Sequence, residues 1–222
     1  METHKKVMAV IAAYNEAKHI TTVLKGVRKY LPSDHVIVVD DGSTDQTSAL
    51  ALEQGAQVLR NIINLGKGAA LKTGCDYALQ EQADIIIVLD ADNQHDPNEI
   101  PTFLQAVNNH DIVFGYRKFN KNMPFVFKFG NTIIKYAIHV LYHMDLKDSQ
   151  CGYRAFTALT YPKIRWSVSD YSLESEMIAH VGNHHLTYTE LPIETIYADK
   201  YKGTTVLDGV KIVINLIMWR LR

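Results

Sequence analysis

Cysteine is scarce in this sequence, because Cys75 and Cys151 are the only two among 222 residues. Their separation is unlike the spacing of a metal site, and two cysteines are too few for a disulfide-stabilised secreted domain. The sequence therefore favours a protein of the reducing cytoplasm.

Long apolar runs are absent as well. The longest candidate, TTVLDGVKIVINLIMW, is interrupted by Asp208 and Lys211. No uninterrupted run reaches the roughly 18 residues that mark a transmembrane helix. We therefore expect a chain that does not span a membrane.

The chain also lacks an excess of charge of either sign. Its 23 Lys and Arg residues nearly balance 24 Asp and Glu residues, for a formal net charge of -1. A nearly neutral chain has no global attraction to nucleic acid, so we expect no nucleic-acid partner and only local contacts with anionic ligands. The apolar content of 47% suffices for a sizeable core, and the length fits one domain spanning residues 1–222.

Apolar runs alternate with helical patterns over the first half of the chain. The runs predict strands at residues 6–14, 35–39, 56–61, 84–92 and 111–117. Continuous apolar strands separated by helices are typical of an α/β fold with a mostly parallel central sheet and helices on both faces.

Polar and charged residues follow four of these strands. Ligands of such sheets bind at the carboxyl ends of the strands, so we expect the site there. The four ends carry Tyr14 and Glu16, Asp40 and Asp41, Asp90 and Asp92, and Arg117.

The run IIIVLDADNQHDP places Asp90 and Asp92 directly after a buried strand. Residues i and i+2 of an extended segment point the same way, so both carboxylates can face one ion. Such oxygen ligands suit Mg²⁺ or Mn²⁺, and Gln94 adds an amide oxygen. The alternative is that Asp92 or Asn93 only caps the helix after Pro97.

Two further motifs contain glycine. VVDDGSTDQT offers Asp41 to a base or a ribose hydroxyl, although the same motif also reads as a turn with Ser43 or Thr44 as a helix cap.

NLGKGAALKTG has neither the Walker nor the dinucleotide order. Its Lys67 and the following helix N-terminus can meet a phosphate or base, or the motif is a glycine loop with a solvated lysine.

Six motifs occur in an order and spacing that mark a family: AAYNEA, VVDDGSTDQT, NLGKGAALKTG, VLDADNQHDP, DIVFGYR and DSQCGYRAF. On these residues the chain resembles the family 2 glycosyltransferases, and within them the polyprenyl-phosphate enzymes such as dolichyl-phosphate mannose synthase. The resemblance extends from Val7 to about Gly209. It implies a GT-A-type nucleotide-diphospho-sugar transferase fold in a single catalytic domain. The nucleotide-sugar half would be residues 1–117 and the acceptor half residues 118–222.

The resemblance and the motifs together name candidate site residues. The nucleotide-binding candidates are Ala12, Tyr14, Glu16, Val39, Asp41, Lys67, Asp90 and Ala91. The metal candidates are Asp90, Asp92 and Gln94, and the catalytic candidates are Asp92, Arg117 and Lys202. The acceptor candidates are Lys128, Arg154, Glu174, Glu176 and Lys200.

The activity that the resemblance implies is metal-dependent transfer, with inversion, of a sugar from a GDP- or UDP-linked donor to a polyprenyl phosphate. A phosphate acceptor is already ionised near neutral pH, whereas a sugar hydroxyl needs a general base, and no unmistakable base is present. Transfer to a hydroxyl acceptor remains the alternative.

Two different classes of protein share part of this pattern. Asp40, Asp41 and Asp90 are similar to the acidic pocket of a receiver domain, but the extra strand and helix before Val36 count against one. A nucleotidyltransferase has a similar fold, but the chain lacks a G-x-G-T-R-type loop. Both classes therefore fit less well than a glycosyltransferase.

Two amphipathic segments complete the expectations. Residues 125–144 are apolar around most of a helix, with Lys135, His139 and His143 as one polar stripe, and VLDGVKIVINLIMWRLR has a similar design. Such an arc must be buried against the core, a partner or lipid. We expect both segments to lie on the cytoplasmic membrane face as interfacial helices, with Lys128 near a lipid phosphate. Whether an oligomer or a membrane-protein partner is involved is left open.

Overall fold

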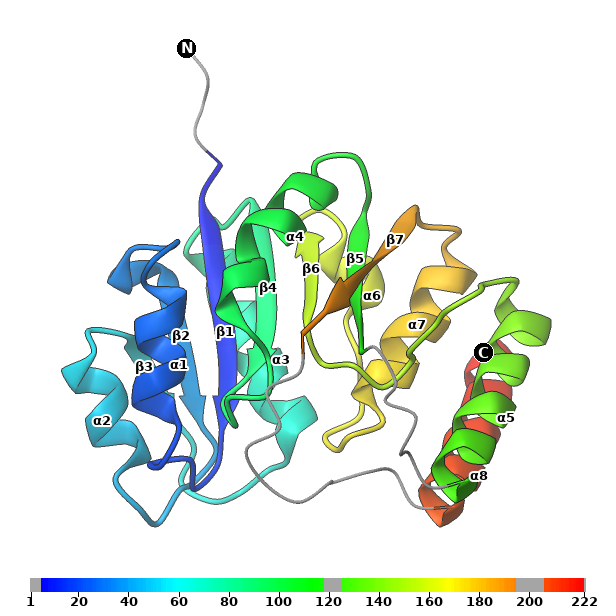
Figure 1. Ribbon diagram of the computed structural model, residues 1–222, viewed down its shortest axis with the longest axis horizontal. Helices are drawn as coiled ribbons and strands as arrows, with labels where there is room; N and C mark the ends of the chain where they lie inside the picture. Colours follow the sequence, from blue (N-terminus) through cyan, green and yellow to red (C-terminus); the bar gives the residue numbers. More distant parts are fainter. Residues whose placement is uncertain (1–4, 118–124, 195–205, 222) are drawn as a thin grey trace.

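The computed structural model describes residues 5–117, 125–194 and 206–221. Its centre is a seven-stranded sheet with the order β3-β2-β1-β4-β6-β5-β7 (Figure 1). The strands are β1 (Val7–Ala13), β2 (Val36–Asp40), β3 (Gln57–Arg60), β4 (Ile85–Asp90), β5 (Ile112–Arg117), β6 (Arg154–Thr157) and β7 (Tyr188–Ile193). The helices are α1 (Ile20–Val27), α2 (Thr47–Glu53), α3 (Lys67–Gln80), α4 (Ile100–Val107), α5 (Phe125–Tyr142), α6 (Tyr161–Ile164), α7 (Leu173–Asn183) and α8 (Val206–Arg220). Short 3-10 helices lie at Ser33–His35 and Pro97–Glu99.

Alternating side chains of the strands supply two apolar layers, one on each face of the sheet. On β1, Val10 belongs to the layer that α3 and α7 cover, and Ile11 to the layer that α1 and α4 cover. A strand covered on both faces is apolar at every position, which explains the run before Asp90. The predicted α/β architecture, with helices on both faces, is confirmed.

Two strands were not apparent in the sequence. β6 runs antiparallel to both β4 and β5, whereas every other described pair is parallel. It has only four residues and begins with Arg154, so it carries little strand signal. β7 contains Glu190 and Pro192 and lies at the edge of the sheet, where a missing proline N–H costs little.

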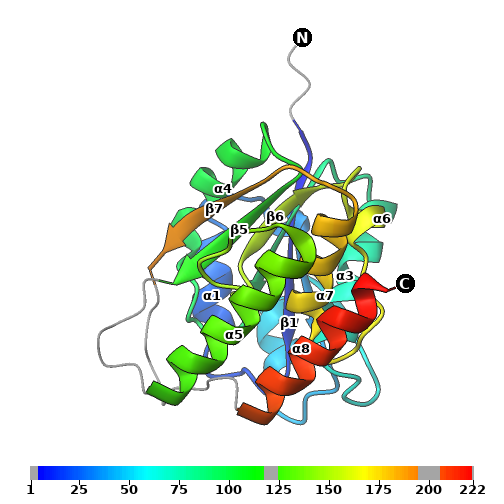
Figure 2. The same ribbon diagram turned by 90° about the vertical axis from the view of Figure 1, so that its right-hand side faces the viewer.

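Helices α5 and α8 lie side by side at the end of the molecule away from β3 (Figures 1 and 2). The Tyr142 hydroxyl donates to the Leu216 carbonyl at 2.6 Å, and Asn183 of α7 donates to the Trp219 carbonyl at 3.2 Å. The inward residues, buried in the core, are Ile134, Ile138, Tyr142, Ile212, Leu216 and Trp219. The exposed residues, called here the outer apolar residues, are Ile133, Tyr136 and Val140 of α5 and Val210, Ile214, Ile217 and Met218 of α8.

Each of the two helices therefore buries one apolar face in the core and exposes a second. Helix α5 ends at Tyr142, so His143 of the predicted polar stripe follows the helix, with a φ of 55°. Among the described residues, no helix combines the length and the apolarity needed to cross a bilayer.

Candidate functional site

The carboxyl ends of β1, β2 and β4 are neighbours at one edge of the sheet. Ala13 of β1 pairs with Asp40 of β2, and Ala12 pairs with Asp90 of β4. β5 runs in the same direction and ends at Arg117. These ends point downward in Figure 1. The sheet therefore brings the predicted strand-end residues to one edge.

Two loops at this edge are fastened to each other. The Asn15 N–H donates to Ser43 Oγ, and the Glu16 N–H donates to Thr47 Oγ1, each at 2.9 Å. Asp45 accepts from the Thr47 N–H, the first N–H of α2, at 3.0 Å. The cap predicted at Ser43 or Thr44 is therefore replaced by Asp45. The wall of the site next to β1 and β2 is thus preformed.

The residues predicted around the base and ribose differ in exposure. Tyr14 is 47% exposed, and Ala12 and Glu16 are partly buried. Glu16 lies 2.8 Å from His19 Nδ1. Val39 is fully buried in the core, so only its main chain can meet a ligand there.

Asp41 is buried and organises the loop after β3. One oxygen accepts from Asn61 Nδ2 at 2.8 Å and from the Leu65 N–H at 2.9 Å, and the other accepts from the Gly66 N–H at 2.8 Å. The predicted ribose contact would be a further hydrogen bond of the same carboxylate. Asp41 therefore links the second and third strand-end loops.

Lys67, the first residue of α3, lies between two carboxylates. Its Nζ is 2.7 Å from Asp90 Oδ1 and 2.9 Å from Glu174 Oε1. Burial lowers the pKa of Lys67, but the charges of Asp90 and Glu174 outweigh burial and raise that pKa above its ordinary value. The ammonium is therefore charged and held by the protein.

The N-terminus of α3 is covered by the segment before α7. The Gly68 and Ala69 N–H groups donate to the Ser169 carbonyl at 2.7 and 3.2 Å, and Trp166 Nε1 donates to the Gly68 carbonyl at 2.7 Å. Lys67 is therefore not a solvated lysine, and two N–H groups at the start of α3 bind the chain itself. The nucleotide contact of Lys67 stays a prediction.

Asp90 is supported by His95, which is not among the predicted site residues. The Asp90 N–H donates to His95 Nδ1 at 3.1 Å, His95 Nε2 lies 3.8 Å from Asp90 Oδ2, and the imidazole stacks on Tyr153. Burial raises the pKa of Asp90, but Lys67 and His95 oppose this and hold it at about 2. Burial in turn lowers the pKa of His95. In the sequence, the one indication of this role is that His95 lies in the run DADNQH together with Asp90 and Asp92.

Asp92 lies in the turn after β4, beyond the buried Ala91. Its Oδ1 accepts from the Gln94 N–H at 3.1 Å, and Asn93 has a φ of 63°. Asp96 caps the following helix by accepting from the Asn98 N–H at 2.9 Å, so the capping alternative is wrong for both Asp92 and Asn93.

The donor set of this turn suits a hard divalent cation. It offers the carboxylates of Asp90 and Asp92 and the amide oxygen of Gln94, all three partly exposed. No cluster of three or more His, Cys, Asp or Glu side chains that could hold a metal occurs among the described residues. One or two carboxylates with substrate phosphates are a usual ligand set for Mg²⁺, so the residues present fit the ion.

Arg117 is oriented by Asp148, which is not among the predicted site residues. Its Nε donates to Asp148 Oδ2 at 2.7 Å and its Nη2 donates to Oδ1 at 3.2 Å. The Asp148 side chain is almost completely buried, whereas that of Arg117 is partly exposed. The guanidinium is therefore held, partly exposed, at the carboxyl end of β5.

Arg154 and Glu176, two of the predicted acceptor contacts, are buried and bound by the protein itself. Arg154 is buried and donates to the carbonyls of Cys151, Ser149 and Glu174. It fastens the segment before β6 to the start of α7, because a buried guanidinium needs acceptors for its donors.

Glu176 is likewise buried. It accepts from the N–H and Oγ of Ser167 and from the Val168 N–H. Burial raises the pKa of Glu176, but the hydrogen bonds from His180, Ser167 and Val168 lower it to about 2. The residue anchors the segment that covers α3.

Of the remaining acceptor candidates, Glu174 is buried, and its Oε2 has no hydrogen-bond partner among the described residues. Lys200 and Lys202 lie outside the described residues, as does the side chain of Lys128.

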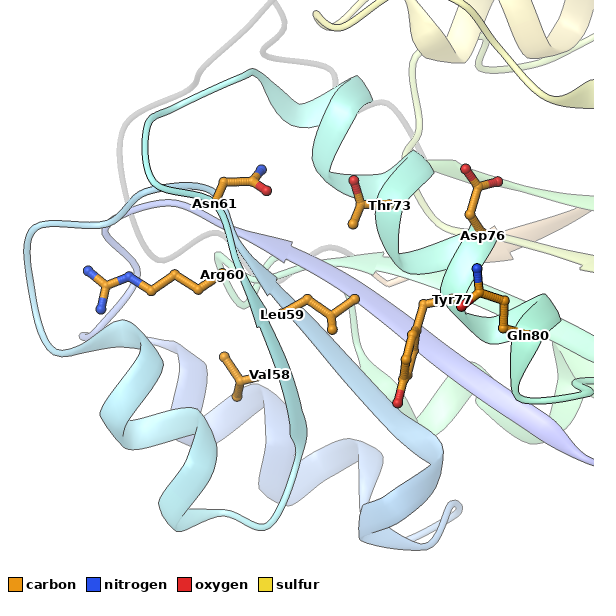
Figure 3. A pocket seen from close by; sticks show the side chains of 8 residues that line it. All are labelled: Val58, Leu59, Arg60, Asn61, Thr73, Asp76, Tyr77 and Gln80. Atoms are coloured by element: carbon orange, nitrogen blue, oxygen red, sulfur yellow. The ribbon is translucent and has the colours of Figure 1, made fainter.

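An open cavity of about 530 Å³ lies between β3 and α3 (Figure 3). It is lined by Val58, Leu59, Arg60, Asn61, Thr73, Asp76, Tyr77 and Gln80. Its carboxylate, Asp76, is already paired with Arg165 at 2.7 Å and accepts from the Tyr161 hydroxyl at 2.9 Å. None of the predicted site residues lines it, so the cavity is distinct from the strand-end site.

The family is established by sequence. The family model described as "Glycosyl transferase family 2" matches residues 8–164. The chain belongs to this family and is a glycosyltransferase, so the receiver and nucleotidyltransferase interpretations are wrong.

Related proteins match almost the whole chain. An uncharacterized protein of Methanocaldococcus jannaschii is 36% identical, over 97% of this chain and 93% of the relative. The UDP-N-acetylglucosamine–dolichyl-phosphate N-acetylglucosaminyltransferase of Methanococcus voltae is 32% identical, over 98% of this chain and 97% of the relative. The polyprenol monophosphomannose synthase of Mycolicibacterium smegmatis is 28% identical, over 94% of this chain and 83% of the relative.

Solved structures support the fold. Glucosyl-3-phosphoglycerate synthase from Mycobacterium tuberculosis, in complex with UDP, superposes with a TM-score of 0.76 at 17% identity. The match covers 97% of this chain and 81% of that chain. The same enzyme has been crystallised with Mn²⁺ and UDP and with Mg²⁺ and UDP. The predicted GT-A-type fold is therefore confirmed.

Proposed function

We propose that this enzyme transfers a sugar, with inversion, from a nucleoside-diphosphate sugar to a polyprenyl phosphate, using Mg²⁺ or Mn²⁺. The observation that carries the proposal is similarity along nearly the whole chain to enzymes named for dolichyl-phosphate or polyprenol acceptors. The outer apolar residues of α5 and α8, within the proposed acceptor half, support the same class of acceptor.

On the donor side, Tyr14, Asp41 and the main chain at Ala12 and Val39 would surround the base and ribose. Arg117 would meet the diphosphate, because a guanidinium suits phosphate oxygens and Asp148 already holds it in place. In this division hydrogen-bond acceptors and an aromatic ring meet the nucleoside, and the positive charge of Arg117 meets the phosphates.

At the centre, Asp90, Asp92 and Gln94 would hold the metal. The ion, when bound, supplies Lewis-acid stabilisation of the charge that builds on the leaving diphosphate. An acceptor phosphate oxygen attacks the anomeric carbon while the bond to the diphosphate oxygen breaks, and the nucleoside diphosphate leaves with that electron pair. Arg117, with Lys202 as the second predicted cation, would stabilise the leaving group.

On the acceptor side, the outer apolar residues of α5 and α8 would rest on the cytoplasmic face of a membrane and bring a lipid-linked phosphate to the site. Apolar residues on one face of a helix are the usual means of interfacial binding. We therefore propose a peripheral membrane enzyme.

A transfer assay tests the function. Purified enzyme with Mn²⁺ is incubated with GDP-mannose, UDP-glucose or UDP-N-acetylglucosamine and with a polyprenyl phosphate in detergent, and lipid-linked sugar is measured by mass spectrometry. We expect a lipid product from at least one donor. Product on glycerol phosphate or a free sugar, with none on the lipid, would replace the acceptor with a soluble one.

A further inference from the structure

Lys67 connects the two halves of the enzyme through charge. It begins α3 in the nucleotide half, Asp90 ends β4 in the same half, and Glu174 lies in the first turn of α7 in the acceptor half. Its Nζ bonds both carboxylates, at 2.7 and 2.9 Å, and only 16% of its side chain is exposed. The two acids are 84 positions apart in the sequence, so only the fold brings them to one ammonium.

The chain is packed tightly around this ammonium. A Cβ at Gly152 would lie 2.9 Å from Lys67 Nζ and 3.0 Å from both oxygens of Asp90. A buried charge that is held this closely is costly to leave unpaired. The bridge is therefore a built feature of the site.

The bridge neutralises a carboxylate that belongs to the proposed metal site. A divalent cation that uses Asp90 must draw that oxygen away from Lys67, or approach while a positive charge lies 2.7 Å behind it. Like charges at such distances repel strongly in a partly buried site. The nucleoside diphosphate contributes negative phosphate oxygens, and these offset the repulsion.

We propose that Lys67 is a positioning residue that occupies Asp90 as a resident cation, so that the divalent metal binds together with the nucleoside diphosphate rather than before it. Glu174 serves as the second partner of Lys67. When Asp90 turns to the metal, Lys67 keeps Glu174 as its partner and does not become an unpaired buried charge. The inference rests on the proposed function for the identity of the nucleotide ligand.

Mn²⁺ binding without nucleotide is the direct test, with free Mn²⁺ counted by its electron paramagnetic resonance signal. Lys67→Met keeps the length of the side chain and removes its charge, so Mn²⁺ alone should bind on the order of tenfold more tightly than to the wild type. Lys72→Met, on the same helix, is the matched control and should leave Mn²⁺ binding unchanged.

Nucleotide coupling is measured next. UDP and GDP are each added to the titration, and the factor by which the nucleotide tightens Mn²⁺ binding is compared between variants. The factor should shrink in Lys67→Met, because the free protein already binds the metal better, and by linkage Mn²⁺ should then help the nucleotide less. Lys67→Arg keeps the charge and should retain most of the wild-type factor.

Glu174→Gln should change the affinity for Mn²⁺ alone in the opposite direction from Lys67→Met. It removes a negative charge and the second partner of Lys67, so Mn²⁺ alone should bind several-fold more weakly than to the wild type. General loosening of the site would shift both variants in the same direction. Tighter Mn²⁺ binding by Glu174→Gln, or unchanged binding by a folded Lys67→Met, overturns the inference.

The proposed function fails separately. A wild-type protein that binds neither UDP nor GDP in the presence of Mn²⁺ refutes the nucleotide site. The titrations with Mn²⁺ alone still decide the role of Lys67, because they contain no nucleotide.

Discussion

Arg117 and Asp148 are joined by two hydrogen bonds between one guanidinium and one carboxylate, at 2.7 and 3.2 Å. Asp148→Asn removes the charge and one acceptor, so Arg117 should lose the fixed orientation in which we propose that it meets the diphosphate. We expect UDP or GDP to bind about tenfold more weakly, with uridine or guanosine unaffected, as measured by calorimetry. Asp76→Asn breaks the exposed pair with Arg165 and is the control. An equal loss for nucleoside and nucleotide would contradict the phosphate role of Arg117.

Asp92 contributes little to the fold, because the hydrogen bond described for its carboxylate comes from the Gln94 N–H within the same turn. Asp92→Asn should therefore abolish transfer and remove the metal-dependent part of nucleotide binding, with a melting temperature close to that of the wild type. Asp96→Asn, at a cap that asparagine preserves, should keep full activity. Normal turnover by Asp92→Asn would refute the metal assignment.

The glycines of the NLGKGAALKTG motif are explained by packing. At Gly66, with a φ of +98°, a Cβ would lie 2.4 Å from the Ser169 carbonyl, and at Gly68 it would lie 2.7 Å from the Val168 carbonyl. Gly68→Ala should lower the free energy of unfolding by about 2 kcal/mol, because a backbone atom must move. At Gly209 in α8 an added Cβ would have no atom within 4 Å. Gly209→Ala should therefore raise the free energy of unfolding, by up to about 1 kcal/mol. Denaturant unfolding measures both, and equal effects would contradict the packing account.

The sequence placed the strand-end residues well, because local patterns determine them. Asp41, Asp90, Asp92 and Arg117 each follow an apolar run, and parallel strands bring such positions to one edge. The bridge from Lys67 could not be predicted in this way, since its two partners come from elements far apart in the chain.

The predicted site residues that prove to be structural are buried charged residues. Arg154 and Glu176 resemble functional residues in the sequence, but they bind mainly main-chain groups, and no sequence pattern reveals these partners. His95 and Asp148 were missed for the converse reason, because each acts by holding a residue that had already been identified. The roles of Lys128, Lys200 and Lys202 stay predictions.

Glu176 makes stability depend on pH. Its pKa in the folded protein is about 2, below the ordinary value of 4.5. A lowered carboxylate pKa stabilises the fold above the ordinary value, and this stabilisation is lost as the pH falls toward 2. Glu176→Gln should cost roughly 2–3 kcal/mol at pH 7, and its difference from the wild type should shrink between pH 4.5 and 2.

The matched control for Glu176 is Glu53→Gln on the exposed side of α2. Urea unfolding at a series of pH values measures both variants. The control should differ little from the wild type at any pH. A Glu176→Gln penalty that is constant from pH 7 to pH 2 would contradict the role of the ionised carboxylate.

Membrane binding is the last prediction, and the outer apolar residues carry it. Ile214 and Ile217 are 55% and 44% exposed on α8, while Leu216 between them is buried. Ile214→Ser with Ile217→Ser should therefore leave the core intact. Each exposed apolar side chain that enters the interface contributes about 1 kcal/mol or more, so the double variant should bind vesicles at least tenfold more weakly.

Flotation with vesicles that contain anionic lipid measures this binding. Leu159→Ser removes an apolar side chain that is 87% exposed, outside α5 and α8, and is the control. Low salt favours any attraction to anionic lipid, so the wild type should float best there. If the wild type stays unbound at low salt, or if Leu159→Ser reduces flotation as much as the double variant, α5 and α8 are not the membrane surface and a soluble acceptor becomes the better proposal.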